Sequence, residues 1–293
     1  INKKNNLNFS DKEYEQIKFT IQNLLFLNEA LKKIEKIYIP NIVISQNGNY
    51  SLSKLFNVYF DKKNIPAYSW EASNHYFKRF EKLFISKNDN NYGLNYIKNN
   101  WKNKFSKNKI TKKNLESVNK HLETIIKAKA LRSFSKKYSS SDKTLRSYYN
   151  IKTDKIVLLC SSSWDEVIGT YILKNKKISD LLIFDTQEIW IKKTIDFFKD
   201  KNDCTLIIRP HPRDYENKNS NVSQFIKSLN IHQNNVILNT PDHKLSLYSI
   251  FKDTNLVLNS WSTLGMESGI FNIPTLSISD ELLLYPSEIE MYQ

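Results

Sequence analysis

The sequence predicts an α/β protein: a doubly wound parallel sheet of the Rossmann-like type in the second half, and a smaller, helix-rich α/β first half. Two observations support this fold class. Short runs rich in Ile, Leu and Val alternate with helix-like stretches across residues 154–278, as expected of strands connected by crossover helices. Hydrophobic residues make up 40% of the 293 residues, which is enough for a sizeable core.

The strands and helices expected in the second half follow one another in strict alternation. The strands are Lys155–Cys160, Thr205–Ile208, Asn235–Leu238, Asn255–Leu258 and Pro274–Ser277, and the helices are Gln187–Lys199, Ser220–Leu229, Lys244–Phe251 and Thr263–Gly269. Alternation implies parallel neighbours, because a crossover between parallel strands packs its helix on the sheet. Ligands of such sheets bind beyond the carboxyl ends of the strands, so the loops after Cys160, Ile208 and Leu258 are the expected binding region.

The first half shows fewer strands. Asp11–Lys36 is expected to be a long amphipathic helix, with Ser10 as N-cap and Glu13 completing a capping box. A strand, a helix and a strand should follow at Asn41–Ser45, Ser51–Lys63 and Pro66–Trp70. From residue 71 to residue 150 the pattern is mostly helical and polar, and residues 98–114 are expected to form an exposed loop or helix hairpin. With two strands visible and Ile1 as first residue, this half is either shortened at its start or a small helical cap.

Positive charge is concentrated in the same half. Residues 1–150 hold 29 Lys and Arg against 12 Asp and Glu, a net charge of +17, whereas residues 151–293 carry −3. Such a face could meet an anionic membrane, an acidic glycan or nucleic acid. The alternative is the Lys- and Asn-rich composition expected of an AT-rich genome. Cys160 and Cys204 are expected to be buried thiols in a reducing compartment, because two cysteines in apolar runs form neither a disulfide framework nor a metal site.

The most specific local pattern is Arg209-Pro210-His211-Pro212-Arg213, directly after an expected strand. The prolines restrict the backbone and would hold the imidazole at the carboxyl end of that strand. Arginine offers planar paired donors and histidine offers a ring N–H, which together suit a phosphate or diphosphate. A rigid turn with solvated arginines and a structural histidine is the alternative.

A second pattern, residues 259–267, follows the strand Asn255–Leu258 and begins a helix. Ser260, Ser262 and Thr263 place hydroxyl groups where a helix N-terminus also offers free N–H groups, an arrangement that binds phosphate. Glu267 lies one turn later, where its carboxylate could accept hydrogen bonds from a ribose. An ordinary N-cap is the alternative.

A third pattern, Ser161-Ser162-Ser163-Trp164-Asp165-Glu166, follows the first strand of the second half. It supplies hydroxyls, an aromatic ring and carboxylates, of which Asp165 is a candidate base. Solvated loop acids are the alternative. Neither GxGxxG nor GxxxxGK[ST] occurs, which argues against a dinucleotide-dependent oxidoreductase and a P-loop NTPase.

Residues 154–278 resemble the donor-binding domain of bacterial capsule and surface-polysaccharide glycosyltransferases of the GT-B architecture. The matching residues are the Ser-Ser-Trp-Asp loop 162–165, Phe184-Asp185, Glu188-Ile189-Trp190, the turn 209–213, Ser262-Thr263-Leu264-Gly265-Met266-Glu267 and Ile273-Pro274-Thr275-Leu276. Residues 41–71, ending in Ser69-Trp70-Glu71, are more weakly similar to the closing part of the first domain of such an enzyme. A His-Pro turn paired with a Ser/Thr turn also occurs in sialyltransferase-like, Kdo-transferase-like and teichoic-acid-polymerase-like enzymes, so the pattern does not specify the donor.

The resemblance implies an acceptor-side domain at residues 1–150 and a nucleotide-sugar-binding domain at residues 151–293. His211 would bind the donor phosphate and stabilise the leaving nucleotide, Ser262 and Thr263 would hold the same phosphate, and Glu267 would bind the ribose. The complete predicted donor-binding set is Arg209, His211, Arg213, Ser161, Ser162, Ser260, Ser262, Thr263 and Glu267. Glu71 and Asp165 are candidate bases, with charged residues of no catalytic role as the alternative. No metal or cofactor is implied beyond a CMP-, UDP- or GDP-linked substrate.

The sequence therefore favours a metal-independent glycosyltransferase that acts at the cytoplasmic membrane face on a growing capsule or lipopolysaccharide glycan, with a glycan or lipid-linked glycan as acceptor and peripheral contact with anionic lipid. Transfer of glycerol or ribitol phosphate from a CDP-linked donor would use the same turns and stays open. A protein that binds nucleic acid or another polyanion would explain the charge of +17 but not the converging patterns at the strand ends. An inactive scaffold of the same fold also stays open.

Overall fold

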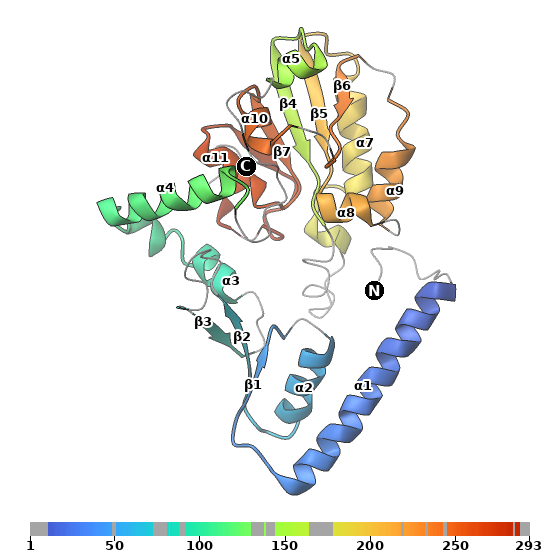
Figure 1. The fold of residues 1–293 in the computed structure, drawn as a ribbon, viewed down its shortest axis with the longest axis vertical. Helices are drawn as coiled ribbons and strands as arrows, with labels where there is room; N and C mark the ends of the chain where they lie inside the picture. The colour runs from blue at the N-terminus through green and yellow to red at the C-terminus, as the bar shows by residue number, and fades with distance from the viewer. Residues whose placement is uncertain are drawn as a thin grey trace. The chain divides into compact units, whose positions relative to one another are not determined.

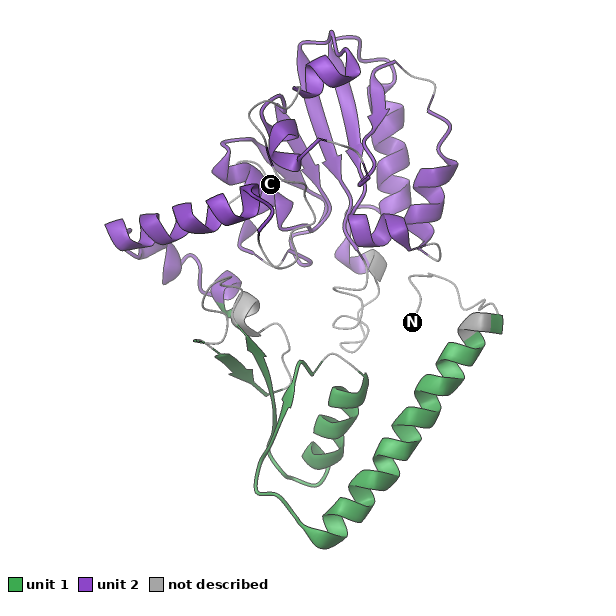
Figure 2. Ribbon diagram, viewed as in Figure 1, with its two compact units in different colours: residues 1–96 green, residues 97–293 purple. Residues whose placement is uncertain are grey.

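The computed structural model describes residues 11–48, 51–72, 81, 83–87, 92–129, 138, 144–163, 178–217, 220–231, 234–242, 245–283 and 285–287. The chain divides into two compact units, Ile1–Tyr96 and Ile97–Gln293 (Figure 2). This division falls earlier than the boundary expected at 150/151. The cause is packing, because Leu145, Tyr149, Ile125 and Ile126 join a hydrophobic core of the second unit.

The second unit contains a five-stranded parallel sheet within the described residues (Figure 1). Its strands are β4 (Lys155–Cys160), β5 (Cys204–Arg209), β6 (Val236–Leu238), β7 (Leu256–Asn259) and β8 (Thr275–Ser277), in the spatial order β6-β5-β4-β7-β8. Each pairing is parallel. The five predicted strands are therefore confirmed, each to within one residue at either end.

Helices cover both faces of this sheet. They are α5 (Leu145–Tyr149), η3 (Ile178–Leu181), α7 (Gln187–Phe198), α8 (Pro212–Glu216), α9 (Asn221–Ser228), α10 (Leu247–Phe251) and α11 (Leu264–Ile270). Successive side chains of a strand point to opposite faces. Leu159 and Ile208 therefore lie in a core with α7 and α9, whereas Leu158 and Ile207 lie in a second core with α5 and α10. The doubly wound prediction is confirmed.

Three further elements of the second unit precede this sheet in the chain. They are α3 (Tyr92–Asn99), which begins in the first unit, η1 (Phe105–Lys107) and α4 (Lys112–Ile126). Thr111 caps α4, since its hydroxyl accepts a hydrogen bond from the Asn114 N–H at 3.2 Å. Residues 98–114 thus contain the end of α3, η1 and the start of α4, joined by turns, which partly confirms the expected helix hairpin.

The first unit is a smaller α/β unit. It contains α1 (Asp11–Ile37), β1 (Val43–Gln46), α2 (Ser51–Asp61), β2 (Ala67–Ala72) and β3 (Leu83–Ser86). β1 and β2 are parallel, as the strand-helix-strand pattern predicts, and β3 is antiparallel to β2. The expectation of two strands was wrong, because the four residues of β3 lie within a polar stretch that hides their pattern. Ser10, the predicted N-cap of α1, lies outside the described residues.

Among the described residues, none of the helices combines the length and the apolarity needed to cross a bilayer. Both cysteines are free and buried, as predicted.

Candidate functional site

The predicted binding patterns follow strands near the point where the strand order of the sheet reverses. β4 and β7 are neighbours, but the chain continues from β4 to β5 on one side and from β7 to β8 on the other. The loops after β4 and β7 therefore leave in opposite directions. A crevice forms at such a switch point in open parallel sheets, and ligands bind there.

Ser161 joins the loop after β4 to the His-Pro turn after β5. Its backbone N–H donates to the carbonyl oxygen of Arg209 at 3.3 Å, and its Oγ accepts from the backbone N–H of His211 at 3.2 Å. His211 is the N-cap of α8, and Pro212 occupies the first helical position, where no N–H is needed. The turn that carries His211 is thus fixed by the two hydrogen bonds to Ser161 and by the start of α8 at Pro212.

Ser162 joins the same loop to α7 and to the loop after β7. The Gln187 amide accepts from the Ser162 N–H at 2.9 Å and donates to the Ser162 carbonyl at 3.0 Å. The Ser162 Oγ accepts from the backbone N–H of Trp261 at 3.3 Å. All three residues are buried, so these bonds are made away from water and rigidify the crossing of the two loops.

Asn259 organises the Ser/Thr turn from the end of β7. Its Oδ1 accepts from the Ser262 N–H at 3.1 Å, and its Nδ2 donates to the Ser262 carbonyl at 3.0 Å and to the Tyr285 hydroxyl at 3.0 Å. The Ser262 Oγ accepts from the Leu264 N–H at 3.3 Å. Thr263 is exposed at the start of α11 and makes no side-chain capping bond there.

Arg209, the last residue of β5, is a buried cation. Its side chain is 8% exposed, and its guanidinium donates to Oδ1 of Asn239, whose Nδ2 donates to the Tyr149 hydroxyl at 3.0 Å. Burial lowers the pKa of Arg209, although an arginine stays charged in proteins. Within the described part of the chain, no carboxylate forms an ion pair with it. The hydrogen bond to Asn239 supplies no counter-charge.

Glu267 lies on α11, which follows β7, whereas Arg209 lies on β5, and β4 lies between these two strands. Its Oε2 accepts from the Tyr248 hydroxyl at 3.0 Å, and burial raises the pKa of its carboxyl. Burial also raises the pKa of the Cys160 thiol to about 12, with Arg209 and Glu267 exerting smaller opposite effects on it. The thiol at the end of β4 therefore lies within electrostatic reach of a cation from β5 and of an acid from α11.

Burial divides the predicted donor-binding residues into two groups. Arg209, Ser161, Ser162 and Ser260 are buried, and the three serine hydroxyls bond backbone groups of the neighbouring loops. The partly or fully exposed group is His211, Arg213, Ser262, Thr263 and Glu267.

Two of the predicted residues are candidate bases. Glu71 lies in β2 of the first unit, and Asp165 lies outside the described residues. The role of either as a base stays a prediction.

Comparison with solved structures places the fold. A structure titled "Thermosulfurimonas dismutans KpsC, beta Kdo 2,4 transferase" is 10% identical over 86% of this chain and 73% of that chain, with a TM-score of 0.52. The KpsC "beta Kdo 2,7 transferase" of the same organism is 12% identical over 98% and 78%, with a TM-score of 0.40. An S. aureus MnaA structure with UDP is 15% identical over 93% and 64%, with a TM-score of 0.39. No protein-family model and no curated protein matches the sequence.

The chain has a GT-B-like α/β fold. At 10% identity the first of these similarities shows the fold alone. The chain spans less than two thirds of the MnaA chain.

Sequence reasoning missed the residues that hold the site together. These are Gln187, Asn239, Asn259, Tyr149 and Tyr248. Asn259 ends an apolar strand, Asn239 directly follows one, and Gln187 begins an amphipathic helix. A polar side chain at the end of an apolar run was the available signal, because a buried polar group needs partners.

Proposed function

We propose that this protein is a glycosyltransferase that moves a sugar from a nucleotide-activated donor to a growing capsule or lipopolysaccharide glycan. The observation that carries the proposal is Arg209, a buried cation whose described partner is a neutral amide, at the carboxyl end of the sheet. An anion such as a diphosphate would supply a counter-charge, which no carboxylate of the described residues supplies. The GT-B-like fold and the loops that meet at the switch point support the same conclusion.

Each predicted residue has a role in this proposal. His211 and Arg209 bind the donor phosphate, with Ser262, Thr263 and Arg213 at its exposed side. Glu267 accepts hydrogen bonds from the ribose. Ser161, Ser162 and Ser260 act by holding the loops, because their hydroxyls already bond backbone groups.

The reaction follows from the charges. The acceptor hydroxyl oxygen forms a bond to the anomeric carbon of the donor sugar, and the bond from that carbon to the phosphate oxygen breaks. The acceptor hydroxyl proton passes to a base, for which Glu71 and Asp165 are the candidates. The departing nucleotide gains negative charge, which His211 and the arginines stabilise without a metal ion, as preorganised donors do in a transition state.

A thermal-shift screen tests the nucleotide site. Wild-type protein and His211→Ala are heated with CMP, CDP, UDP, GDP or ADP. A nucleotide at a hundred times its dissociation constant stabilises the fold by about 2.7 kcal/mol, which raises the melting temperature by several degrees. We expect one nucleotide to do so for the wild type and for His121→Ala, whose histidine lies on α4, but not for His211→Ala.

The identity of the nucleotide then narrows the donor. CMP would indicate an acidic sugar such as Kdo or sialic acid, UDP or GDP a common hexose, and CDP a glycerol or ribitol phosphate donor. The proposal fails if no nucleotide shifts the wild type while heparin or DNA does.

A further inference from the structure

Residues 98–129 form a projection from the second unit, which we call the basic arm. It comprises the last turn of α3, η1 and α4 (Figure 1). No residue of the arm is fully buried. The arm is nevertheless attached at both ends. Lys98 donates to the carbonyl oxygens of Asp280 and Leu283, and Ile125 and Ile126 pack against the core that contains α5 and α10.

The free part of the arm exposes aliphatic side chains on one side. On α4, Leu115, Val118, Leu122 and Ile125 recur at helical spacing and form one face. The end of this face near Ile125 is packed, whereas Leu115 and Val118 are 53% and 48% exposed. Ile110, just before α4, is also an exposed aliphatic residue, at 76%.

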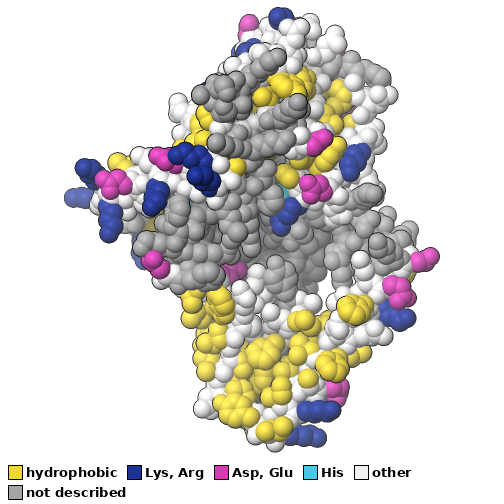
Figure 3. All heavy atoms as spheres, viewed as in Figure 1, with side chains coloured by type: hydrophobic (Ala, Val, Ile, Leu, Met, Phe, Trp, Pro, Cys, Tyr) yellow, Lys and Arg dark blue, Asp and Glu magenta, His cyan; other side chains and the backbone are white. Residues whose placement is uncertain are grey.

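The same segment is strongly basic. It contains ten lysines and no arginine against Glu116 and Glu123, a net charge of +8. Blue side chains gather over the projecting α4 in the space-filling view (Figure 3). Every lysine from Lys102 to Lys120 is exposed.

We propose that the basic arm docks this protein on an anionic phospholipid bilayer, with Ile110, Leu115 and Val118 inserted among the lipids and the lysines on the headgroups. An amphipathic helix with a lysine-rich polar face and an aliphatic face lies in the membrane interface in this way. Each lysine near an anionic leaflet contributes about 1 kcal/mol, or about fivefold in affinity.

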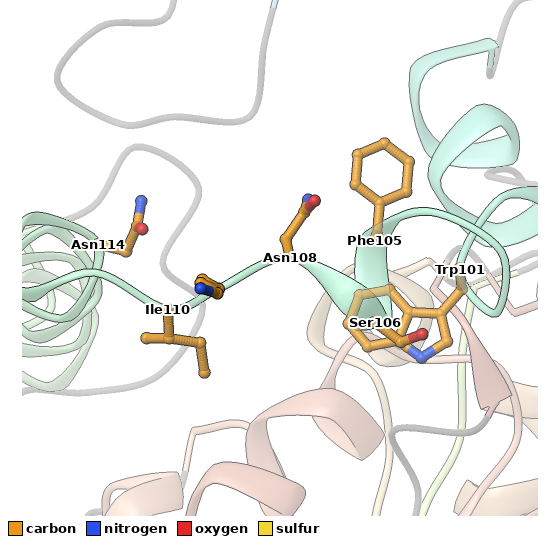
Figure 4. A pocket seen from close by; sticks show the side chains of 7 residues that line it. Trp101, Phe105, Ser106, Asn108, Ile110 and Asn114 are labelled. Atoms are coloured by element: carbon orange, nitrogen blue, oxygen red, sulfur yellow. The ribbon is translucent and has the colours of Figure 1, made fainter.

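An open hollow lies beside α4. It measures about 580 Å³ and is lined by Trp101, Phe105, Lys109 and Ile110 among others (Figure 4). Tryptophan is enriched at the membrane–water interface, at the level of the headgroups.

Other occupants fit less well. A second copy of the arm would bring ten lysines against ten lysines. A soluble polyanion would use the lysines but has no apolar part to cover Ile110, Leu115 and Val118. This inference goes beyond sugar transfer, since its test involves no nucleotide and no acceptor.

Vesicle co-sedimentation tests the charge component. Wild-type protein is mixed with vesicles of phosphatidylcholine alone or of phosphatidylcholine with phosphatidylglycerol. We expect binding to the anionic vesicles that falls as salt is added. Changing Lys107, Lys109, Lys112 and Lys113 to Gln should weaken it by at least about a hundredfold. The matched control changes Lys152, Lys155, Lys192 and Lys199 to Gln, which removes the same charge from exposed positions elsewhere in the second unit.

A second pair of variants tests the aliphatic component. Ile110→Ser with Leu115→Ser should weaken vesicle binding by about a hundredfold or more, because both side chains lose the free energy gained by burial in lipid. Binding to heparin should not change. Ile183→Ser is the matched control, since Ile183 is also 76% exposed in the second unit. Thermal unfolding should be the same in all variants, because every changed position is exposed.

Three results would overturn the proposal. The first is that the wild type does not bind anionic vesicles. The second is that the arm and control lysine variants lose affinity equally, which would reduce the effect to overall charge. The third is that the Ile110 and Leu115 changes leave vesicle binding intact, which would make the arm a site for soluble polyanions.

Discussion

The backbone N–H of His211 donates to Oγ of Ser161 at 3.2 Å, across 50 residues of sequence. This bond joins the loop after β4 to the turn after β5, and so fixes the backbone of His211 beside the loop after β4. A small hydroxyl group at one strand end thus fixes the backbone at the end of another.

Ser161→Ala should lower the free energy of unfolding by about 1–2 kcal/mol, because the partly buried His211 N–H loses its acceptor. The affinity for the nucleotide should fall as well, since the turn is released. Urea unfolding and calorimetric titration measure the two effects. Ser117→Ala, at an exposed position of α4, should cause neither loss.

Gln187→Ala should be more destabilising than Ser161→Ala. It leaves both the N–H and the carbonyl of Ser162 without the amide that bonds them, and each unpaired buried group costs about 1–3 kcal/mol. We expect a loss of roughly 2–4 kcal/mol in urea unfolding. The exposed Gln22→Ala should stay within about 0.5 kcal/mol of wild type, and a similarly small effect of Gln187→Ala would contradict the buried bridge.

Asn239→Asp should increase the free energy of unfolding by roughly 1–2 kcal/mol, because a carboxylate would face the buried Arg209 guanidinium in place of an amide. The same change should weaken nucleotide binding, since the cation would already be neutralised. Urea unfolding and nucleotide titration test the two statements. The exposed Asn234→Asp is the control, with an expected effect within about 0.5 kcal/mol. A destabilised Asn239→Asp protein would contradict this prediction.

Glu267 should make stability depend on pH. Burial raises the pKa of its carboxyl, so the folded chain binds this proton more tightly than the unfolded chain. Stability should therefore fall as pH rises from the ordinary Glu pKa of about 4.3 to the raised folded value. Glu267→Gln removes this effect and should gain stability relative to wild type across that window.

Urea unfolding at a series of pH values measures this difference. Tyr248→Phe should enlarge the loss of stability with rising pH. It removes the hydrogen bond that partly offsets the effect of burial on the pKa of Glu267. A difference between wild type and Glu267→Gln that is constant from acid to neutral pH would contradict the prediction.

Local patterns predicted most of the fold because they depend on neighbouring residues. β4 to β8 were found as short aliphatic runs, and α7 was found as a periodic stretch that begins at Gln187. β3 was missed because its short run, Leu83–Ser86, lies within a polar stretch, although it pairs with β2. The boundary between the units also differs from the expected one, since α5 packs against a sheet that follows it in sequence.

The sequence by itself determined the alternation of strands and helices, the aliphatic content of each strand, and the polar groups at the strand ends. Only the tertiary structure decided that β4 lies between β5 and β7, and that Ser162 meets Trp261 from 99 residues away. It also decided which predicted donor residues are buried and which are partly or fully exposed. The physical reason is that strand order and burial arise from long-range packing, whereas hydrophobic periodicity is set by residues within a few positions of one another.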